Sequence, residues 1–230
     1  HVPGAVALDW PEVDLVETTG PAIEAWRAAV EAKLTERALL PSDTIVVYDD
    51  GTLYAARLWW ILRQLGQREV RVLNGGLAAW RAAGGALEEG LTLPSPAAPY
   101  RGTPDPSVLA TVDEVRAALG DPGVVLLDAR SAEEYAAGHI PGAVNVDFTR
   151  NAASEPPRRW KPAAELRAMY AAVGVVPEQR VIAYCTTGVR AAVAVFTLAL
   201  LGYPDWANFS GSWREWSADP DRPVTVGEEP

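Results

Sequence analysis

The chain has 230 residues, and its 30 acidic against 20 basic side chains give a formal net charge of −10. This excess of acid argues against a nucleic-acid-binding surface, because phosphates would be repelled, and no run of about 18 uncharged apolar residues predicts a membrane span. A single cysteine excludes an internal disulfide and a cluster of thiolate metal ligands.

The first residues, His1-Val2-Pro3-Gly4, contain neither Met nor a basic and apolar signal segment. We therefore expect the natural N-terminus to lie upstream of this sequence. The expected location is the cytoplasm, and the missing start leaves a signal peptide open.

An internal repeat organises the chain. Residues 1–6 (HVPGAV) recur 138 positions later as residues 139–144 (HIPGAV), and residues 48–50 (YDD) align with residues 184–186 (YCT) at an offset of 136. Ordered matches at a nearly constant offset predict two copies of one structural unit.

The first copy begins abruptly at its His-Val-Pro-Gly turn and lacks the strand and helix that precede this turn in the second copy. Five prolines fall within residues 91–106, a composition that resists both helix and strand and predicts a semi-rigid linker. We therefore predict an incomplete domain over residues 1–90, a linker over residues 91–106 and a complete domain over residues 107–230.

The second copy alternates short apolar runs with segments of helical length. The runs predicted to be buried parallel strands are residues 124–128, 181–184 and 206–209. Helices are predicted after the capping boxes at residues 111–114 (TVDE) and 131–134 (SAEE), and over residues 162–173 and 190–201. This alternation predicts an α/β fold, in which a parallel sheet carries helices on both faces.

Cys185 lies between a predicted strand and a predicted helix, in the run Cys185-Thr186-Thr187-Gly188-Val189-Arg190. Ligands bind beyond the carboxyl ends of parallel strands, and a helix start offers free amides and the positive end of its dipole. Both effects favour a thiolate and predict a nucleophile. A lone cysteine can also be a small buried hydrophobe, but its counterpart Asp49 argues against a packing position. With Asp49 in place, the first copy is expected to be chemically silent.

Four motifs together resemble the tandem rhodaneses. They are the two His-x-Pro-Gly-Ala turns, residues 127–130 (LDAR), the Cys-x-x-Gly-Val-x-Ala loop and residues 211–216 (GSWREW). This family includes thiosulfate sulfurtransferases and 3-mercaptopyruvate sulfurtransferases. The resemblance implies two rhodanese-like domains, a small anionic sulfur donor, a persulfide on Cys185, a thiol or cyanide as acceptor, and no cofactor.

The loop itself is expected to stabilise negative charge at the cysteine. The predicted substrate-binding residues there are Thr186, Thr187, Gly188, Val189 and Arg190. Gly188 is expected to let the ring of amides close, through positive φ or a close backbone approach. Thr187 supplies a hydroxyl where mercaptopyruvate enzymes of this family usually have serine, although Thr187 can equally solvate its own backbone.

Two residues outside the loop are further candidates for substrate binding. Arg130 follows a predicted strand and resembles the family's substrate-binding arginine, with a surface ion pair as the alternative. Resemblance also implies that His1, in the first-domain turn, can face the cleft and touch substrate. His139 is expected only to fix its own turn. The tryptophans expected in core and interdomain packing are Trp59, Trp60, Trp80, Trp213 and Trp216.

We predict thiosulfate as the donor, because Arg130 and Arg190 can offer a small dianion positive charge from two sides. The alternative is 3-mercaptopyruvate, but residues 131–135 (SAEEY) lack the second arginine typical of that subfamily. A cysteine phosphatase is disfavoured, because the four residues between Cys185 and Arg190 are one fewer than such enzymes use. A noncatalytic binding module is disfavoured by the presence of Cys185.

Overall fold

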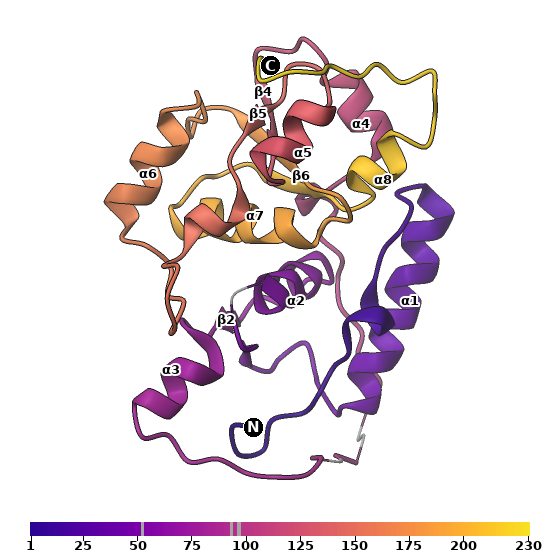
Figure 1. Ribbon diagram of the computed structural model, residues 1–230. Coiled ribbons are helices and arrows are strands. Elements are labelled where there is room, and N and C mark those ends of the chain that lie inside the picture. Colours follow the sequence, from indigo (N-terminus) through magenta and orange to yellow (C-terminus); the bar gives the residue numbers. More distant parts are fainter. Residues whose placement is uncertain (52, 93, 96–97) are drawn as a thin grey trace.

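The computed structural model describes residues 1–51, 53–92, 94–95 and 98–230, and each half of the chain contains its own parallel sheet (Figure 1). The first half comprises η1 (Trp10–Val13), α1 (Gly20–Glu36), β1 (Ile45–Val47), α2 (Leu53–Gln64), β2 (Val70–Val72) and α3 (Gly76–Ala82). The second half comprises η2 (Pro106–Val108), β3 (Leu109–Ala110), α4 (Val112–Ala117), β4 (Val124–Asp128), α5 (Ala132–Ala137), β5 (Val144–Asn145), η3 (Phe148–Asn151), α6 (Ala163–Ala171), β6 (Arg180–Tyr184), α7 (Val189–Leu200), β7 (Trp206–Phe209) and α8 (Ser212–Trp216). Among the described residues, no helix is long and apolar enough to cross a membrane.

The second half is built on a five-stranded parallel sheet with the strand order β3-β7-β6-β4-β5. Its central strand β6 places alternate side chains in two different apolar clusters, Val181 in one and Ile182 in the other. Both faces of the sheet are therefore covered, as expected for parallel strands. The predicted α/β fold is confirmed, with β4 and β7 at their predicted bounds and β6 starting one residue early.

The helices of the second half begin where their capping residues predict. Thr111 and Ser131 each accept a hydrogen bond from the backbone amide three residues later, and both capping boxes are complete. The helix predicted over residues 162–173 is shorter, because Pro162 is its N-cap and the chain turns after Ala171. The next helix, α7, runs from Val189 to Leu200, which is one residue earlier at each end than predicted.

The repeat is visible in the positions of the elements. Shifting β1, β2 and α2 by 136 residues places them on β6, β7 and α7, and shifting η1 by 138 places it on η3. In the described part of the first half the sheet has only the strands β1 and β2. The described sheet of the first copy thus has fewer strands than the sheet of the second.

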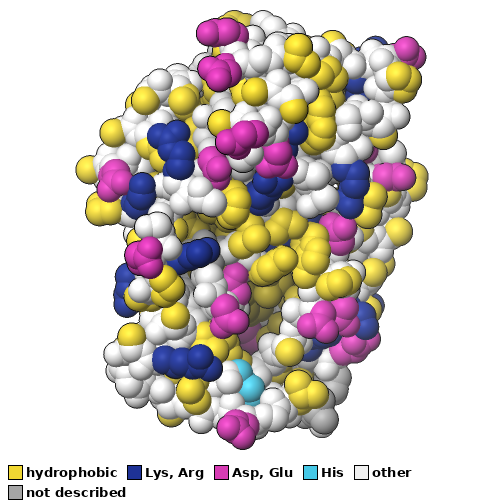
Figure 2. Space-filling model, in the orientation of Figure 1, with side chains coloured by type: hydrophobic (Ala, Val, Ile, Leu, Met, Phe, Trp, Pro, Cys, Tyr) yellow, Lys and Arg dark blue, Asp and Glu magenta, His cyan; other side chains and the backbone are white. Residues whose placement is uncertain are grey.

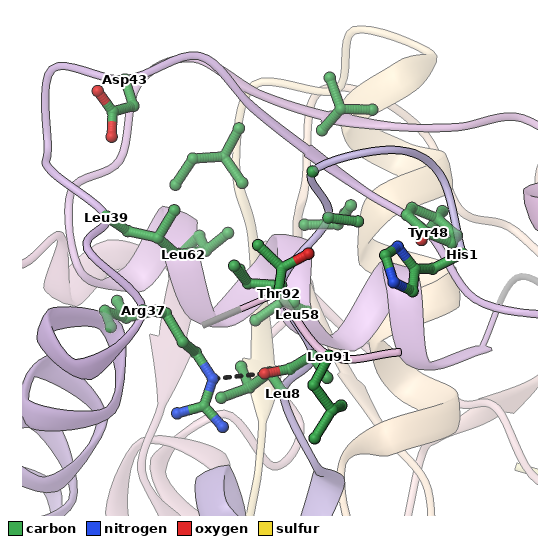
Figure 3. A pocket seen from close by; sticks show the side chains of 18 of the residues that line it. His1, Leu8, Arg37, Leu39, Asp43, Tyr48, Leu58, Leu62, Leu91 and Thr92 are labelled. Carbon is green, nitrogen blue, oxygen red and sulfur yellow. Dashed lines mark hydrogen bonds between the residues drawn. The ribbon is translucent and has the colours of Figure 1, made fainter. Parts of the chain in front are cut away.

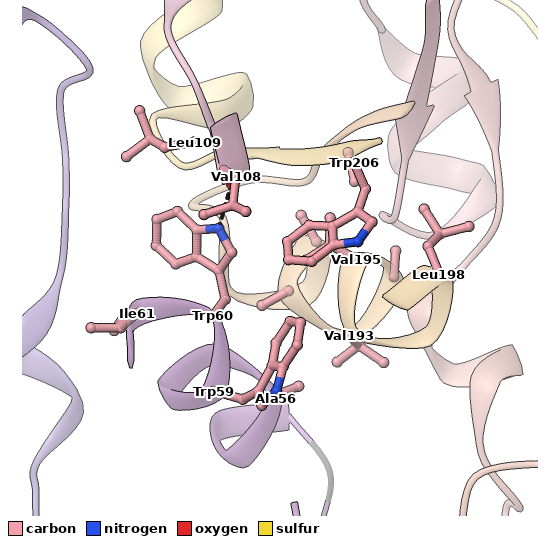
Figure 4. Close-up of a cluster of buried hydrophobic side chains, with 14 of the residues drawn as sticks. Ala56, Trp59, Trp60, Ile61, Val108, Leu109, Val193, Val195, Leu198 and Trp206 are labelled. Atoms are coloured by element: carbon pink, nitrogen blue, oxygen red, sulfur yellow. Dashed lines mark hydrogen bonds between the residues drawn. The ribbon is translucent and has the colours of Figure 1, made fainter. Parts of the chain in front are cut away.

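Packing of α2 against α7 joins the two halves (Figure 4). The ring of Trp59 on α2 lies 5.0 Å from Phe196 on α7 and 5.4 Å from Trp206 on β7, and the Trp60 indole donates to the Val108 carbonyl at 2.7 Å. One apolar cluster thus spans both halves. Of the predicted packing tryptophans, Trp59, Trp60 and Trp216 are buried, whereas Trp80 and Trp213 are partly exposed.

The predicted linker, residues 91–106, includes residues 93, 96 and 97, which lie outside the described residues. Its later part is anchored on the first half. Tyr100 is fully buried, its amide donates to the Thr35 hydroxyl at 2.8 Å, and its own hydroxyl donates to Gln67 at 3.0 Å. The domain boundaries themselves stay a prediction.

Candidate functional site

Cys185 follows the last residue of β6, and three residues later Gly188 caps the start of α7. Its side chain is 1% exposed, and the Gly188 N–H donates to its sulfur at 3.1 Å. The positive end of the α7 dipole points at the same place. Amide and dipole both stabilise negative charge on the sulfur, which is the requirement for a thiolate nucleophile.

Gly188 closes the loop under the cysteine. Its φ is +78°, and a Cβ there would lie 2.7 Å from the Ser210 carbonyl oxygen. Both reasons considered for this glycine, positive φ and close backbone approach, therefore apply. Its carbonyl accepts from the Asn208 amide at 2.9 Å and from the Arg57 guanidinium at 3.3 Å. The loop is thus fixed by its own half and by the first half together.

Ser212 supports the cysteine from the turn after β7. The Cys185 backbone N–H donates to its hydroxyl at 3.1 Å, and that hydroxyl donates to the Phe209 carbonyl at 2.7 Å. Ser212 has φ +56°, and the equivalent Gly76 in the first half has φ +57°. A serine in this left-handed conformation is rare and often marks a functional site. Sequence reasoning noticed residues 211–216 as a motif but did not give Ser212 a role.

Arg190 is held beside the loop by Glu134. Two guanidinium nitrogens lie 2.6 and 2.8 Å from the Glu134 carboxylate oxygens. This pairing lowers the pKa of Glu134 to about 2. Hydrogen bonding to Glu134, together with the negative charge of Cys185, raises the pKa of Arg190. Arg190 is therefore a fixed cation next to the sulfur, and Glu134 is a site residue that the sequence showed only as part of a capping box.

Thr186, Thr187 and Val189 are the remaining residues of the predicted loop. The Thr186 hydroxyl is 3.3 Å from a Glu134 oxygen and also accepts from Arg190. Thr187 is half-buried, and Val189 is the first residue of α7. The five predicted residues thus run from the connection after β6 into the first turn of α7.

Arg130 turns into its own domain. It is 3% exposed, and its guanidinium forms a bidentate pair with Asp128, from Nε to Oδ1 at 3.1 Å and from Nη2 to Oδ2 at 2.6 Å, and donates to the Gly138 carbonyl at 2.7 Å. The alternative considered for Arg130 was a surface ion pair, but the pair that forms is buried. Its Nε and one terminal nitrogen are engaged at the end of β4, and in the described part of the chain no hydrogen bond or ion pair connects it to the Cys185 loop.

His1 lies in the first half and contacts no residue of the Cys185 loop in the described part of the chain. Its ring nitrogens lie 2.9 Å from the Val2 carbonyl and 3.1 Å from the Gly90 carbonyl. His1 lines a cavity of about 640 Å³ together with Leu8, Tyr48 and Leu58 (Figure 3). Hydrophobic side chains gather in the hollow on this face of the molecule (Figure 2). The structure therefore brings the loop residues together but leaves His1 apart from them.

Asp49 fills the equivalent position in the first copy. Its carboxylate accepts from the amides of Gly51 at 2.9 Å, Tyr54 at 2.8 Å and Ala55 at 3.2 Å, and so caps the start of α2. A side-chain carboxylate thus occupies the amides that an external anion would need. This arrangement supports the expectation that the first copy is chemically silent.

Comparison with known proteins gives concordant matches. Residues 1–83 and 111–219 match the family of rhodanese-like domains. Over 245 residues the chain is 38% identical to a probable 3-mercaptopyruvate sulfurtransferase of Pseudomonas aeruginosa, covering 99% of this chain and 85% of that protein. A thiosulfate sulfurtransferase of the same organism is 34% identical and is covered over 86% of its length, with 98% of this chain aligned.

Solved structures give the same fold. A variant of the protein EanB in complex with ergothioneine superimposes with a TM-score of 0.87 at 27% identity. The match covers 99% of this chain and 60% of that chain. This chain therefore spans somewhat less than two thirds of the length of that structural relative.

Proposed function

The chain belongs to the rhodanese family and is a sulfurtransferase, and we propose that it carries sulfane sulfur from thiosulfate to a thiophilic acceptor through a persulfide on Cys185. The observation that carries this proposal is the Gly188 N–H on the Cys185 sulfur at the start of α7. A group that must bear negative charge in every state of the cycle, as thiolate and as persulfide, lies where amides and a helix dipole favour it.

In the first half-reaction the Cys185 thiolate attacks the outer sulfur of thiosulfate. A new sulfur–sulfur bond forms, the bond inside thiosulfate breaks, and sulfite leaves with that electron pair. In the second half-reaction a nucleophile such as cyanide or a thiolate attacks the terminal sulfur of the persulfide. Cys185 then leaves as thiolate, and no external oxidant or reductant is needed.

The loop residues have distinct parts in this cycle. The amides of residues 186–189 and the α7 dipole hold the developing charge, with Gly188 allowing the loop to close around the sulfur. Arg190 adds a fixed positive charge for the anionic donor, oriented by its bidentate pair with Glu134. Arg130, paired with Asp128, supports the end of β4 in this proposal rather than binding the donor.

The choice of donor follows from the number of binding groups that each candidate requires. Thiosulfate is a small dianion that amides and one guanidinium can hold. Mercaptopyruvate needs additional donors for its carboxylate and ketone, and in the described structure Thr187 is the loop hydroxyl that remains for this purpose. The second candidate donor, 3-mercaptopyruvate, is favoured by the 38% identical relative, which is named a probable 3-mercaptopyruvate sulfurtransferase.

Mass spectrometry of the intact protein after incubation with each donor tests the proposal. We expect one added sulfur on the wild-type chain, lost on addition of cyanide, and none on Cys185→Ser. An unmodified wild-type chain with both donors would point to a noncatalytic binding module.

Steady-state kinetics should give a higher kcat/KM for thiosulfate than for 3-mercaptopyruvate, and the reverse order would assign the chain to the second candidate.

A further inference from the structure

Arg57 reaches the cysteine loop from the other half of the molecule. It is on α2 of the first half and is 1% exposed. One guanidinium nitrogen donates to the Gly188 carbonyl at 3.3 Å and another to the Ser210 hydroxyl at 2.8 Å. Its planar head lies over the rings of Trp60 at 4.4 Å and Trp10 at 5.2 Å. The packing of α2 against α7 is what delivers this group to the loop.

The charge of Arg57 has no carboxylate of its own. In the described chain no Asp or Glu lies within ion-pair distance, and its Nε has no partner. The facing carboxylate, Asp14, is instead 3.5 Å from Arg214. Burial lowers the pKa of Arg57 to about 10, so it remains a cation near neutral pH. The titratable and charged groups around this region are Asp14, Arg214, Cys185, Arg190 and Glu134.

An unpaired buried guanidinium is costly, because it gives up water without gaining a counter-charge. Two anions act on Arg57 electrostatically, first Asp14 and then the sulfur of Cys185. Asp14 is shared with Arg214, whereas the Cys185 sulfur accepts the N–H of Gly188, the residue whose carbonyl Arg57 contacts. A thiolate or persulfide on Cys185 therefore adds to the compensation of the buried cation.

The contact with Gly188 also has a geometric consequence. In a planar trans peptide the carbonyl and the following N–H point in opposite directions. Arg57 on α2 and Asn208 on β7 hold the Gly188 carbonyl on their side of the loop. The N–H of Val189, the first amide of α7, must therefore point away from Arg57 and Asn208.

We propose that Arg57 is a positioning residue of the sulfurtransferase site, supplied by the first half, that orients the Gly188–Val189 peptide and provides the buried counter-charge of the Cys185 sulfur. This inference rests on the proposed function for its catalytic meaning. It gives the first copy a role in the reaction although Asp49 occupies its own loop.

The test separates charge from geometry by following alkylation of Cys185 with iodoacetamide as a function of pH. In Arg57→Met the pH of half-maximal alkylation should rise by about one unit, because an opposite charge near the thiolate is lost, and kcat/KM should fall about tenfold or more. Arg57→Lys keeps the charge but not the two-pronged contact, so its alkylation midpoint should stay near wild type while kcat falls. Arg63→Met, on the same helix, is the matched control and should leave both unchanged.

A folded Arg57→Met protein with the wild-type alkylation midpoint and wild-type kcat overturns the proposal, because a purely structural role would lower only the unfolding temperature. If Arg57→Met does not fold, Arg57→Lys and Ser210→Ala replace it in the test. A wild-type kcat in both of these variants would likewise overturn the proposal. Alkylation needs no sulfur donor. A shifted midpoint in a protein that never forms a persulfide would therefore refute the proposed function and leave the role of Arg57 standing.

Discussion

Replacing Gly188 with alanine tests the geometry of the cysteine loop directly. The residue has φ +78°, a conformation that costs an L-residue about 1–2 kcal/mol. The new Cβ would also lie 2.7 Å from the Ser210 carbonyl oxygen and 2.8 Å from the Ser210 Cα, both backbone atoms. Overpacking of this kind adds about 1–3 kcal/mol. We therefore expect Gly188→Ala to lower the free energy of unfolding by about 2–5 kcal/mol.

Gly174→Ala is the matched control for this substitution. Gly174 has φ +82°, but a methyl group on its Cα would meet no neighbouring atom within 4 Å, so only the conformational cost of about 1–2 kcal/mol applies. Urea denaturation of both variants measures the difference. Equal losses in the two variants would show that the backbone around Ser210 yields freely, and the argument for a tightly closed loop would fail.

The Gly188→Ala variant should also lose activity. A displaced Gly188 no longer aims its N–H at the Cys185 sulfur, and loss of one such donor lowers kcat by about a hundredfold. Gly174→Ala should keep wild-type turnover at a temperature where both variants are folded. Wild-type kcat in Gly188→Ala would remove this amide from the mechanism.

Three further predictions concern charges at the two loops. Arg190→Ala should lower kcat/KM for the anionic donor by about tenfold to a thousandfold, and wild-type kinetics would place the anion site elsewhere. The pKa of Glu134 is depressed from 4.5 to about 2, so its stabilising effect is complete above pH 4.5 and is lost as pH falls toward 2. Glu134→Gln should accordingly be less stable than wild type in thermal unfolding at neutral pH, with a difference that shrinks over that acid range, and a constant difference would contradict the pairing. Asp49→Ala should cost about 1 kcal/mol of unfolding free energy through its lost cap while sulfur transfer stays near wild type, and a large loss of turnover would show that the first loop takes part in the reaction.

Local sequence determined much of this protein. The near-constant offset between the copies, the capping boxes at Thr111 and Ser131, and the apolar runs of β4 and β7 fix the elements, because capping and strand patterning depend on residues a few positions apart. The placement of Cys185 between a strand and a helix follows for the same reason. Helix ends were less well defined, since Pro162 and the turn after Ala171 shorten α6.

Only the tertiary structure decided which distant side chains meet at the cysteine. Glu134 is 56 residues from Arg190 and Arg57 is 131 residues from Gly188, and no periodicity or local motif couples positions so far apart. The orientation of Arg130 was open for a related reason, because its guanidinium can follow either a substrate or a neighbouring carboxylate, and the buried Asp128 two residues away forms the closer pair. Sequence patterns specify which backbone elements form, whereas the partners of long charged side chains are set by how the two halves pack.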